Sequence, residues 1–241
     1  MPVRAFFRHS LVLTYALPER VLQPLLPPGL TLDKHGEFGF VAIAMVQTEK
    51  LRPSFVPEFL GQDFFLSGYR IFSRFTTRTG KNLRGLRILR SDTNRTLMAC
   101  FGNLLTHYNY RKAKVQVSES DDRLEIAIET PNAEADLHVV ADIGNTPAPL
   151  PDGSVFSTPQ EARRFAGPLP FTFDYESETN SIVMIKGVRE NWNPELVSAR
   201  VSKATFFEHP PFREETPVLS SVFYVRQIPY RWERGVREQL P

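Results

Sequence analysis

The sequence is poor in cysteine and has no long apolar segment. Its single cysteine, Cys100, excludes an intramolecular disulfide framework and suits a reducing compartment. No apolar run approaches the roughly 20 residues of a membrane helix. The N-terminal segment, which contains Arg4 and Arg8, lacks an apolar core of signal-peptide length. We therefore expect a cytoplasmic protein that has no membrane partner.

Common catalytic and cofactor motifs are also missing. Gly80-Lys81 is followed by Asn82 rather than by the serine or threonine of a phosphate loop. Neither a dinucleotide-binding glycine pattern nor a Gly-x-Ser-x-Gly nucleophile elbow occurs. One cysteine cannot form a thiolate metal site, and the histidines lack metal-ligand spacing; they are His9, His35, His107, His138 and His209. The sequence thus predicts neither a metal nor a cofactor.

The charges of the chain are nearly balanced, with a net charge of +2 that is too small to indicate a polyanionic partner. Residues 70–114 nevertheless contain eleven basic side chains and one acid, Asp92. This stretch fits either a surface for an anionic ligand or a set of arginines paired with later acids. We favour the second interpretation, because in a regular strand Arg84 and Arg90 point one way and Arg87 the other. The pattern matches no nucleic-acid-binding module.

The apolar periodicity predicts many strands and few helices. Strands are expected at residues 11–15, 38–46, 69–77, 83–89, 124–128, 137–143, 171–175, 182–188, 196–206 and 219–228. Short helices are expected at residues 18–26, at 97–105 after the capping candidates Asp92 to Asn94, and after the capping box that starts at Thr158. We therefore predict one α+β domain, residues 1–241, built mainly of antiparallel strands.

Three blocks of the N-terminal half carry a family resemblance. They begin with Arg8-His9-Ser10-Leu11 and its short helix, with Phe64-Phe65-Leu66, and with Leu89-Arg90-Ser91-Asp92 and its helix. Together they resemble the acetoacetate decarboxylase superfamily, and more closely its branch known as a domain of unknown function. The resemblance implies a closed, cone-shaped β-barrel with a few short helices. The family commonly assembles into homo-oligomers, so the resemblance also makes a homo-oligomer possible for this chain.

The resemblance also locates an internal site. In the decarboxylases a lysine pair follows the third block, and its first lysine forms a Schiff base with the substrate. Here Tyr110 and Arg111 stand at those two positions, and Leu66 replaces an acidic residue. Arg8 matches the arginine that faces the substrate carboxylate. Tyrosine cannot form an imine, so a genuine acetoacetate decarboxylase is not expected.

Three functions remain open for this chain. The first is a small-molecule-binding protein whose internal β-cavity takes an anionic or carboxylate-bearing ligand. Its predicted binding residues are Arg8, Leu66, His107, Tyr108, Tyr110 and Arg111. The second is an enzyme of altered chemistry, a lyase or a hydrolase-like protein, with tyrosine or histidine as acid–base groups or Lys112 as a displaced amine. The third is a protein-interaction module with an exposed aromatic surface.

Overall fold

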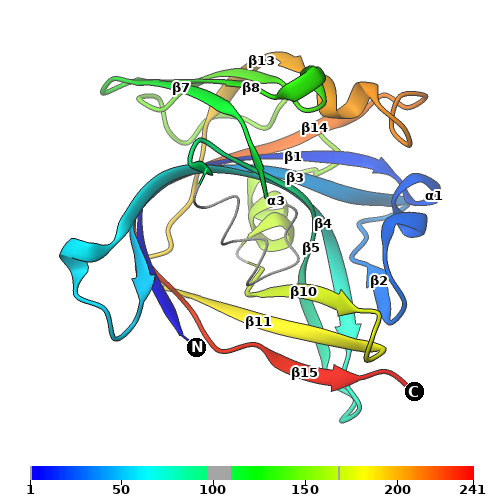
Figure 1. Ribbon diagram of the computed structural model, residues 1–241. Coiled ribbons are helices and arrows are strands. Elements are labelled where there is room, and N and C mark those ends of the chain that lie inside the picture. Colours follow the sequence, from blue (N-terminus) through cyan, green and yellow to red (C-terminus); the bar gives the residue numbers. More distant parts are fainter. Residues whose placement is uncertain (1, 97–109, 168) are drawn as a thin grey trace.

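The computed structural model describes residues 2–96, 110–167 and 169–241, which form two β-sheets and a few short helices (Figure 1). The strands are β1 (Val3–Pro18), β2 (Leu30–Leu32), β3 (Phe38–Pro53), β4 (Gln62–Thr76), β5 (Asn82–Thr93), β6 (Tyr110–Lys112), β7 (Lys114–Glu119), β8 (Arg123–Glu129), β9 (Leu137–Asp142), β10 (Phe171–Glu176), β11 (Ser181–Arg189), β12 (Glu195–Leu196), β13 (Ser198–Ala204), β14 (Val218–Trp232) and β15 (Val236–Gln239). The helices are α1 (Glu19–Leu22), α3 (Pro159–Ala166) and the 3₁₀ turns η1 (Gln23–Leu25), η2 (Glu58–Leu60), η3 (Pro131–Ala133) and η4 (Thr205–Glu208). The prediction of a mainly β chain with few short helices is confirmed.

The larger sheet curls into a ring. Its pairings run β14-β1-β3-β4-β5-β10-β11, and β11 pairs with β14 again. Long antiparallel ladders join the first five of these strands. An antiparallel ladder joins β10 to β11, and two short ladders connect this pair to the rest of the ring. In the first, Phe171 to Phe173 of β10 run parallel to β5, and in the second, Gly187 to Arg189 of β11 pair with β14. Helix α3 packs against the inner face through Ala162 and Phe165.

Alternation along the strands separates the two faces of the ring. In β3, Ile43 and Met45 belong to the core beneath the second sheet, whereas Ala42 and Ala44 belong to the inner clusters. Because β3 is covered on both faces, its sequence is a nearly continuous apolar segment. The strand prediction for residues 38–46 is confirmed in this way.

A second sheet, ordered β13-β9-β8-β7, covers the outer face of β1, β3 and β4 (Figure 1). In β8 the fully buried Leu124 and Ile126 alternate with Glu125, whose side chain is 36% exposed. One face of this sheet therefore packs on the ring and the other meets water, as the alternation predicts. The sequence does not predict that these strands form a separate second sheet.

The capping box of α3 forms at its expected place. The Thr158 hydroxyl accepts a hydrogen bond from the Glu161 amide at 3.1 Å, and the Glu161 carboxylate accepts one from the Ser157 amide at 2.7 Å. Both bonds satisfy amides near the helix start that have no intrahelical partner. Asp92 lies within β5 rather than at a helix cap. The helix predicted at residues 97–105 lies outside the described residues.

Most arginines of the basic stretch make ion pairs, but only some of their partners are the later acids that we expected. Arg74 and Arg84 contact Asp33, Arg87 contacts Asp174, and Arg90 contacts Asp92 and Glu134. The expected direction of two of them was wrong: Arg84 reaches the inner Phe165, whereas Arg90 faces the second sheet. The cause is a bulge at Leu89, which shifts the register between β4 and β5. One extra residue reverses the alternation of side chains.

Candidate functional site

Two of the predicted binding residues lie on the inner face of the ring. Leu66 is half-buried on β4, and Tyr110 on β6 pairs in register with Ser91 of β5. Ser91 is itself opposite Gly68 of β4, which shares a face with Leu66. Tyr110 and Leu66 thus belong to one surface that neighbouring strands form.

The other predicted residues are placed elsewhere. Arg8 is 61% exposed, with its Nε 3.6 Å from Glu119 Oε2 on the second sheet. Arg111 is 52% exposed and forms an ion pair with Glu134. Lys112 is exposed. The structure does not bring Arg8, Tyr110 and Arg111 together, and His107 and Tyr108 lie outside the described residues.

A charged side chain that we did not predict, Arg70, lies beside Tyr110. A Cβ atom at Gly68 would sit 2.8 Å from Arg70 Nε, so the guanidinium lies over this glycine. Burial raises the pKa of Tyr110 to about 12, and the positive charge of Arg70 acts against this rise. At neutral pH the phenol therefore keeps its proton and can donate a hydrogen bond next to a fixed positive charge.

Small side chains and buried hydroxyls extend this surface across the ring. Arg70 is opposite Ala42, Ala42 is opposite Thr14, and Thr14 is opposite Ser221. Thr14 and Ser221 are fully buried, and neither hydroxyl has a hydrogen-bond partner among the described residues. Buried polar groups without partners are rare in folded proteins and call for an explanation. This row of paired residues, Arg70, Ala42, Thr14 and Ser221, thus places a cation and two hydroxyls around the short side chain of Ala42.

This inner surface, Thr14, Ala42, Gly68, Arg70, Ser91, Tyr110 and Ser221, is the candidate site. Its chemistry is that of anion recognition, because it presents a guanidinium, a neutral phenol and hydroxyls but no carboxylate. Within the described ranges, no cluster of three or more His, Cys, Asp or Glu side chains is arranged to hold a metal. Arg70 could have been found in the sequence. Residues 64, 66, 68, 70 and 72 share a face, and Arg70 is the charged residue in that otherwise apolar series.

The sequence matches the model of the DUF2071 family, described as an uncharacterized conserved protein, over residues 4–229. The chain belongs to this family. No curated protein matches the sequence.

Solved structures of other proteins share the fold of this DUF2071 chain. Acetoacetate decarboxylase from Legionella pneumophila has a TM-score of 0.65 at 13% identity, over 99% of this chain and 87% of that one. The enduracididine biosynthesis enzyme MppR, complexed with pyruvate, has a TM-score of 0.63 at 9% identity, over 98% of this chain and 90% of that one. An acetoacetate decarboxylase-like enzyme from Sphingomonas wittichii has a TM-score of 0.62 at 11% identity, over 98% of this chain and 92% of that one. The predicted acetoacetate-decarboxylase-like fold is confirmed; identities this low show the fold alone.

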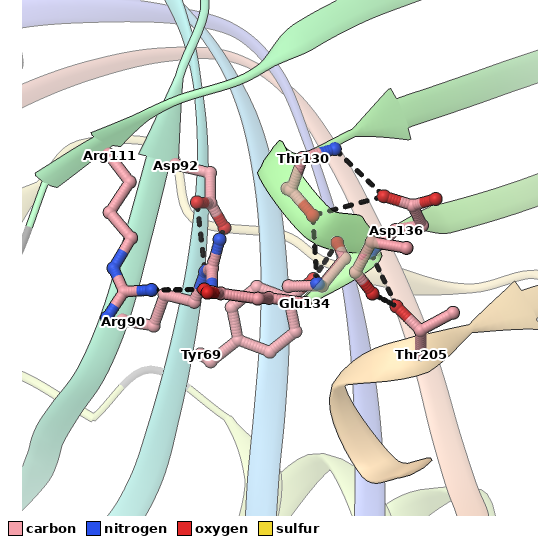
Figure 2. Close-up of polar contacts among 10 residues, drawn as sticks. Tyr69, Arg90, Asp92, Arg111, Thr130, Glu134, Asp136 and Thr205 are labelled. Carbon is pink, nitrogen blue, oxygen red and sulfur yellow. Dashed lines mark hydrogen bonds and ion pairs between the residues drawn. The ribbon is translucent and has the colours of Figure 1, made fainter. Parts of the chain in front are cut away.

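A polar network anchors β6 in the DUF2071 chain and so holds Tyr110 in place (Figure 2). Arg111 and Arg90 both contact the Glu134 carboxylate, and Arg90 also contacts Asp92. Adjacent residues of a strand point to opposite faces. The Arg111 contact outside the ring therefore fixes the inward direction of Tyr110.

His9 is a buried titratable group between the two sheets. The side chain is 1% exposed, and its Nδ1 lies 3.4 Å from Glu119 Oε2, near Arg8 and Tyr224. Burial is the largest effect and lowers the pKa of His9; Glu119 opposes it and Arg8 adds to it. The folded chain therefore favours neutral His9 more than the unfolded chain does.

We expect this histidine to destabilise the fold in mild acid. As pH falls below about 6.5, the unfolded chain binds a proton that folded His9 resists, so the free energy of unfolding decreases by at most about 1.4 kcal/mol per pH unit. Urea unfolding at several pH values between 7.5 and 5.5 measures the slope. His9→Phe should reduce it, whereas the exposed control His209→Gln should not. An unchanged slope in His9→Phe contradicts this assignment.

Membrane insertion through helices finds no support in the described part of the chain, where every helix is too short to cross a bilayer.

Proposed function

We propose that this protein binds a small carboxylate-bearing molecule inside its β-ring, with Arg70 as the main charged contact and Tyr110 as a neutral donor. The observation that carries the proposal is the placement of Arg70 over Gly68, next to Tyr110, on the inner face of the ring. An arginine presents two parallel donors that match the geometry of a carboxylate. The Thr14 and Ser221 hydroxyls supply further polar contacts along the same row.

The fold relatives support a ligand of this class. MppR has been solved with pyruvate, and also with the condensation product of pyruvate and imidazole 4-carboxaldehyde. Both ligands derive from a small keto acid. This chain has tyrosine where the decarboxylases have the amine. Lys112 pairs with Thr93 on the same face as Tyr110, but its side chain is exposed. We therefore propose binding without an imine.

Arg70→Gln should weaken carboxylate binding about 10- to 100-fold, because a hydrogen bond to a charged group contributes about 1.5–3 kcal/mol. Isothermal titration with pyruvate and a panel of small carboxylates measures this. Tyr110→Phe removes one hydrogen-bond donor and should weaken carboxylate binding several-fold. Arg78→Gln is the matched control, because it removes the same charge from the exposed β4–β5 turn.

Three outcomes would contradict the proposal. The first is that no carboxylate of the panel binds to the folded protein. The second is that Arg78→Gln weakens binding as much as Arg70→Gln. The third is a covalent adduct at Lys112 after borohydride reduction in the presence of a keto acid. That adduct requires an imine and would favour the enzyme of altered chemistry.

A further inference from the structure

A pocket of about 400 Å³ opens on the surface near the start of β1, away from Arg70 and Tyr110. Four basic side chains line it, Arg4, Lys50, Arg52 and Arg231, against two acidic ones, Glu58 and Glu190. Apolar residues complete the lining, among them Phe6, Val188 and Pro229. The pocket thus combines an excess of positive charge with an apolar wall.

Three of the arginines form a ladder across neighbouring strands. Arg4 of β1 lies directly opposite Arg52 of β3 on one side and opposite Arg231 of β14 on the other. Directly opposed residues of antiparallel strands have their Cβ atoms about 5 Å apart, and like charges at such positions are destabilising. The repulsion between these arginines destabilises the protein when no ligand is bound, and an anion between the guanidiniums would relieve it.

The acids of the pocket do not neutralise the whole ladder. Glu58 is 2.5 Å from Lys50 Nζ and 3.4 Å from an Arg52 guanidinium nitrogen. Its charge therefore compensates Lys50 and Arg52 rather than Arg4 and Arg231. Among the described residues, the Arg231 side chain has a single ion-pair contact, 4.0 Å from Glu233, and it remains 53% exposed. The Arg4 side chain is exposed and has no ion pair or hydrogen bond with that part of the chain. Arg4 and Arg231 are therefore available to a ligand.

The loop that supplies Glu58 also exposes large apolar side chains. Phe55, Phe59 and Leu60 are 76%, 84% and 56% exposed. Ion pairs from Lys50 and Arg52 to Glu58 hold the base of this loop, and the Lys50 amide donates to Asp63 at 2.7 Å. A loop with an apolar tip beside a basic pocket suits a ligand with an anionic group and an apolar part.

We propose that this pocket binds a phosphate group, with Arg4 and Arg231 as its principal contacts. Guanidinium groups bind phosphate through paired, charge-assisted hydrogen bonds. The apolar wall and Phe59 accommodate the carbon part of the ligand. A free phosphate monoester and a phospholipid headgroup present this same chemistry to the arginines.

Titration with inorganic phosphate and glycerol 3-phosphate at constant ionic strength tests the pocket. Saturable binding is expected, and Arg4→Gln and Arg231→Gln should each weaken it about 10-fold or more. Arg200→Gln is the matched control, because Arg200 is exposed on β13 of the other sheet and has no ion-pair partner among the described residues. Arg70→Gln should also have no effect, which separates this site from the one inside the ring.

Vesicles distinguish the two sources of the phosphate. Sedimentation with phosphatidic acid vesicles, but not with phosphatidylcholine alone, together with its loss in Phe59→Ser, assigns the site to a headgroup. Saturable binding of glycerol 3-phosphate that Phe59→Ser leaves intact, without sedimentation, assigns it to a free ester. Absence of both, or equal weakening by Arg200→Gln, overturns the proposal.

Discussion

Replacement of Tyr69 by alanine should lower the free energy of unfolding by about 3–5 kcal/mol, the range for truncating a large buried aromatic side chain. Tyr69 is fully buried where β4 meets the second sheet. Its ring stacks on Phe206 with centroids 4.3 Å apart. Its hydroxyl donates a hydrogen bond to the Ala135 carbonyl at 3.1 Å (Figure 2). One side chain thus fastens η4 and the segment between η3 and β9 to the ring.

Tyr69→Phe separates the two contributions. It keeps the ring and removes the hydrogen bond, so its cost should be about 1 kcal/mol. Chemical denaturation of both variants and the wild type provides the comparison. If the alanine variant loses no more stability than the phenylalanine variant, packing of this ring does not hold the sheets together.

The double substitution Arg74→Met with Arg84→Met should also cost about 3–5 kcal/mol, because it leaves a buried carboxylate without its cations. Asp33 is fully buried, and its two oxygens lie 2.7 Å from Arg74 Nε and 2.6 Å from Arg84 Nε. Arg84 additionally donates to the Phe165 carbonyl at 2.8 Å and so ties α3 to the wall of the ring. Thermal and denaturant unfolding measure the loss.

A triple variant provides the control. Adding Asp33→Asn to the double variant removes the uncompensated charge while keeping nearly the same shape, and it should restore a large part of the lost stability. A double variant as stable as the wild type, or one that the third substitution does not help, contradicts this role for Asp33.

The strands and α3 could be predicted because local patterns determine them. Alternation marks β8, a continuous apolar segment marks β3, and Thr158 with Glu161 marks the start of α3. Each signal comes from residues that are close in sequence. The family resemblance then supplied the ring, which no local pattern contains.

Side-chain direction was harder to predict than strand position. Phe7 packs in an inner cluster, whereas Leu11 on the same strand faces the second sheet, although both have odd numbers. The register shift between Phe7 and His9 reverses the alternation there and leaves Arg8 exposed. A bulge depends on pairing with a distant strand, so the residues around Arg8 do not reveal it.

The candidate site was missed for the same reason. The alternation of residues 64–72 marks Arg70 as a charged residue on one face of β4, but only the pairing of β4 with its neighbours shows which residues surround it. Its position opposite Ala42 and near Tyr110 follows from three ladders between segments that are far apart in the sequence. The resemblance drew attention to position 110 but gave no hint of residue 70.

The pairing of β1 with β14 also constrains how the chain can fold during synthesis. Residues 3–16 need residues 218–232 as hydrogen-bonding partners, so one edge of β1 stays open while most of the protein is translated. Strands β1, β3, β4 and β5 can assemble as a meander before that, because neighbouring ladders link them. An apolar meander with an open edge is prone to pair with other chains. A nascent chain stalled before β14 is therefore the form of this protein that most needs a chaperone.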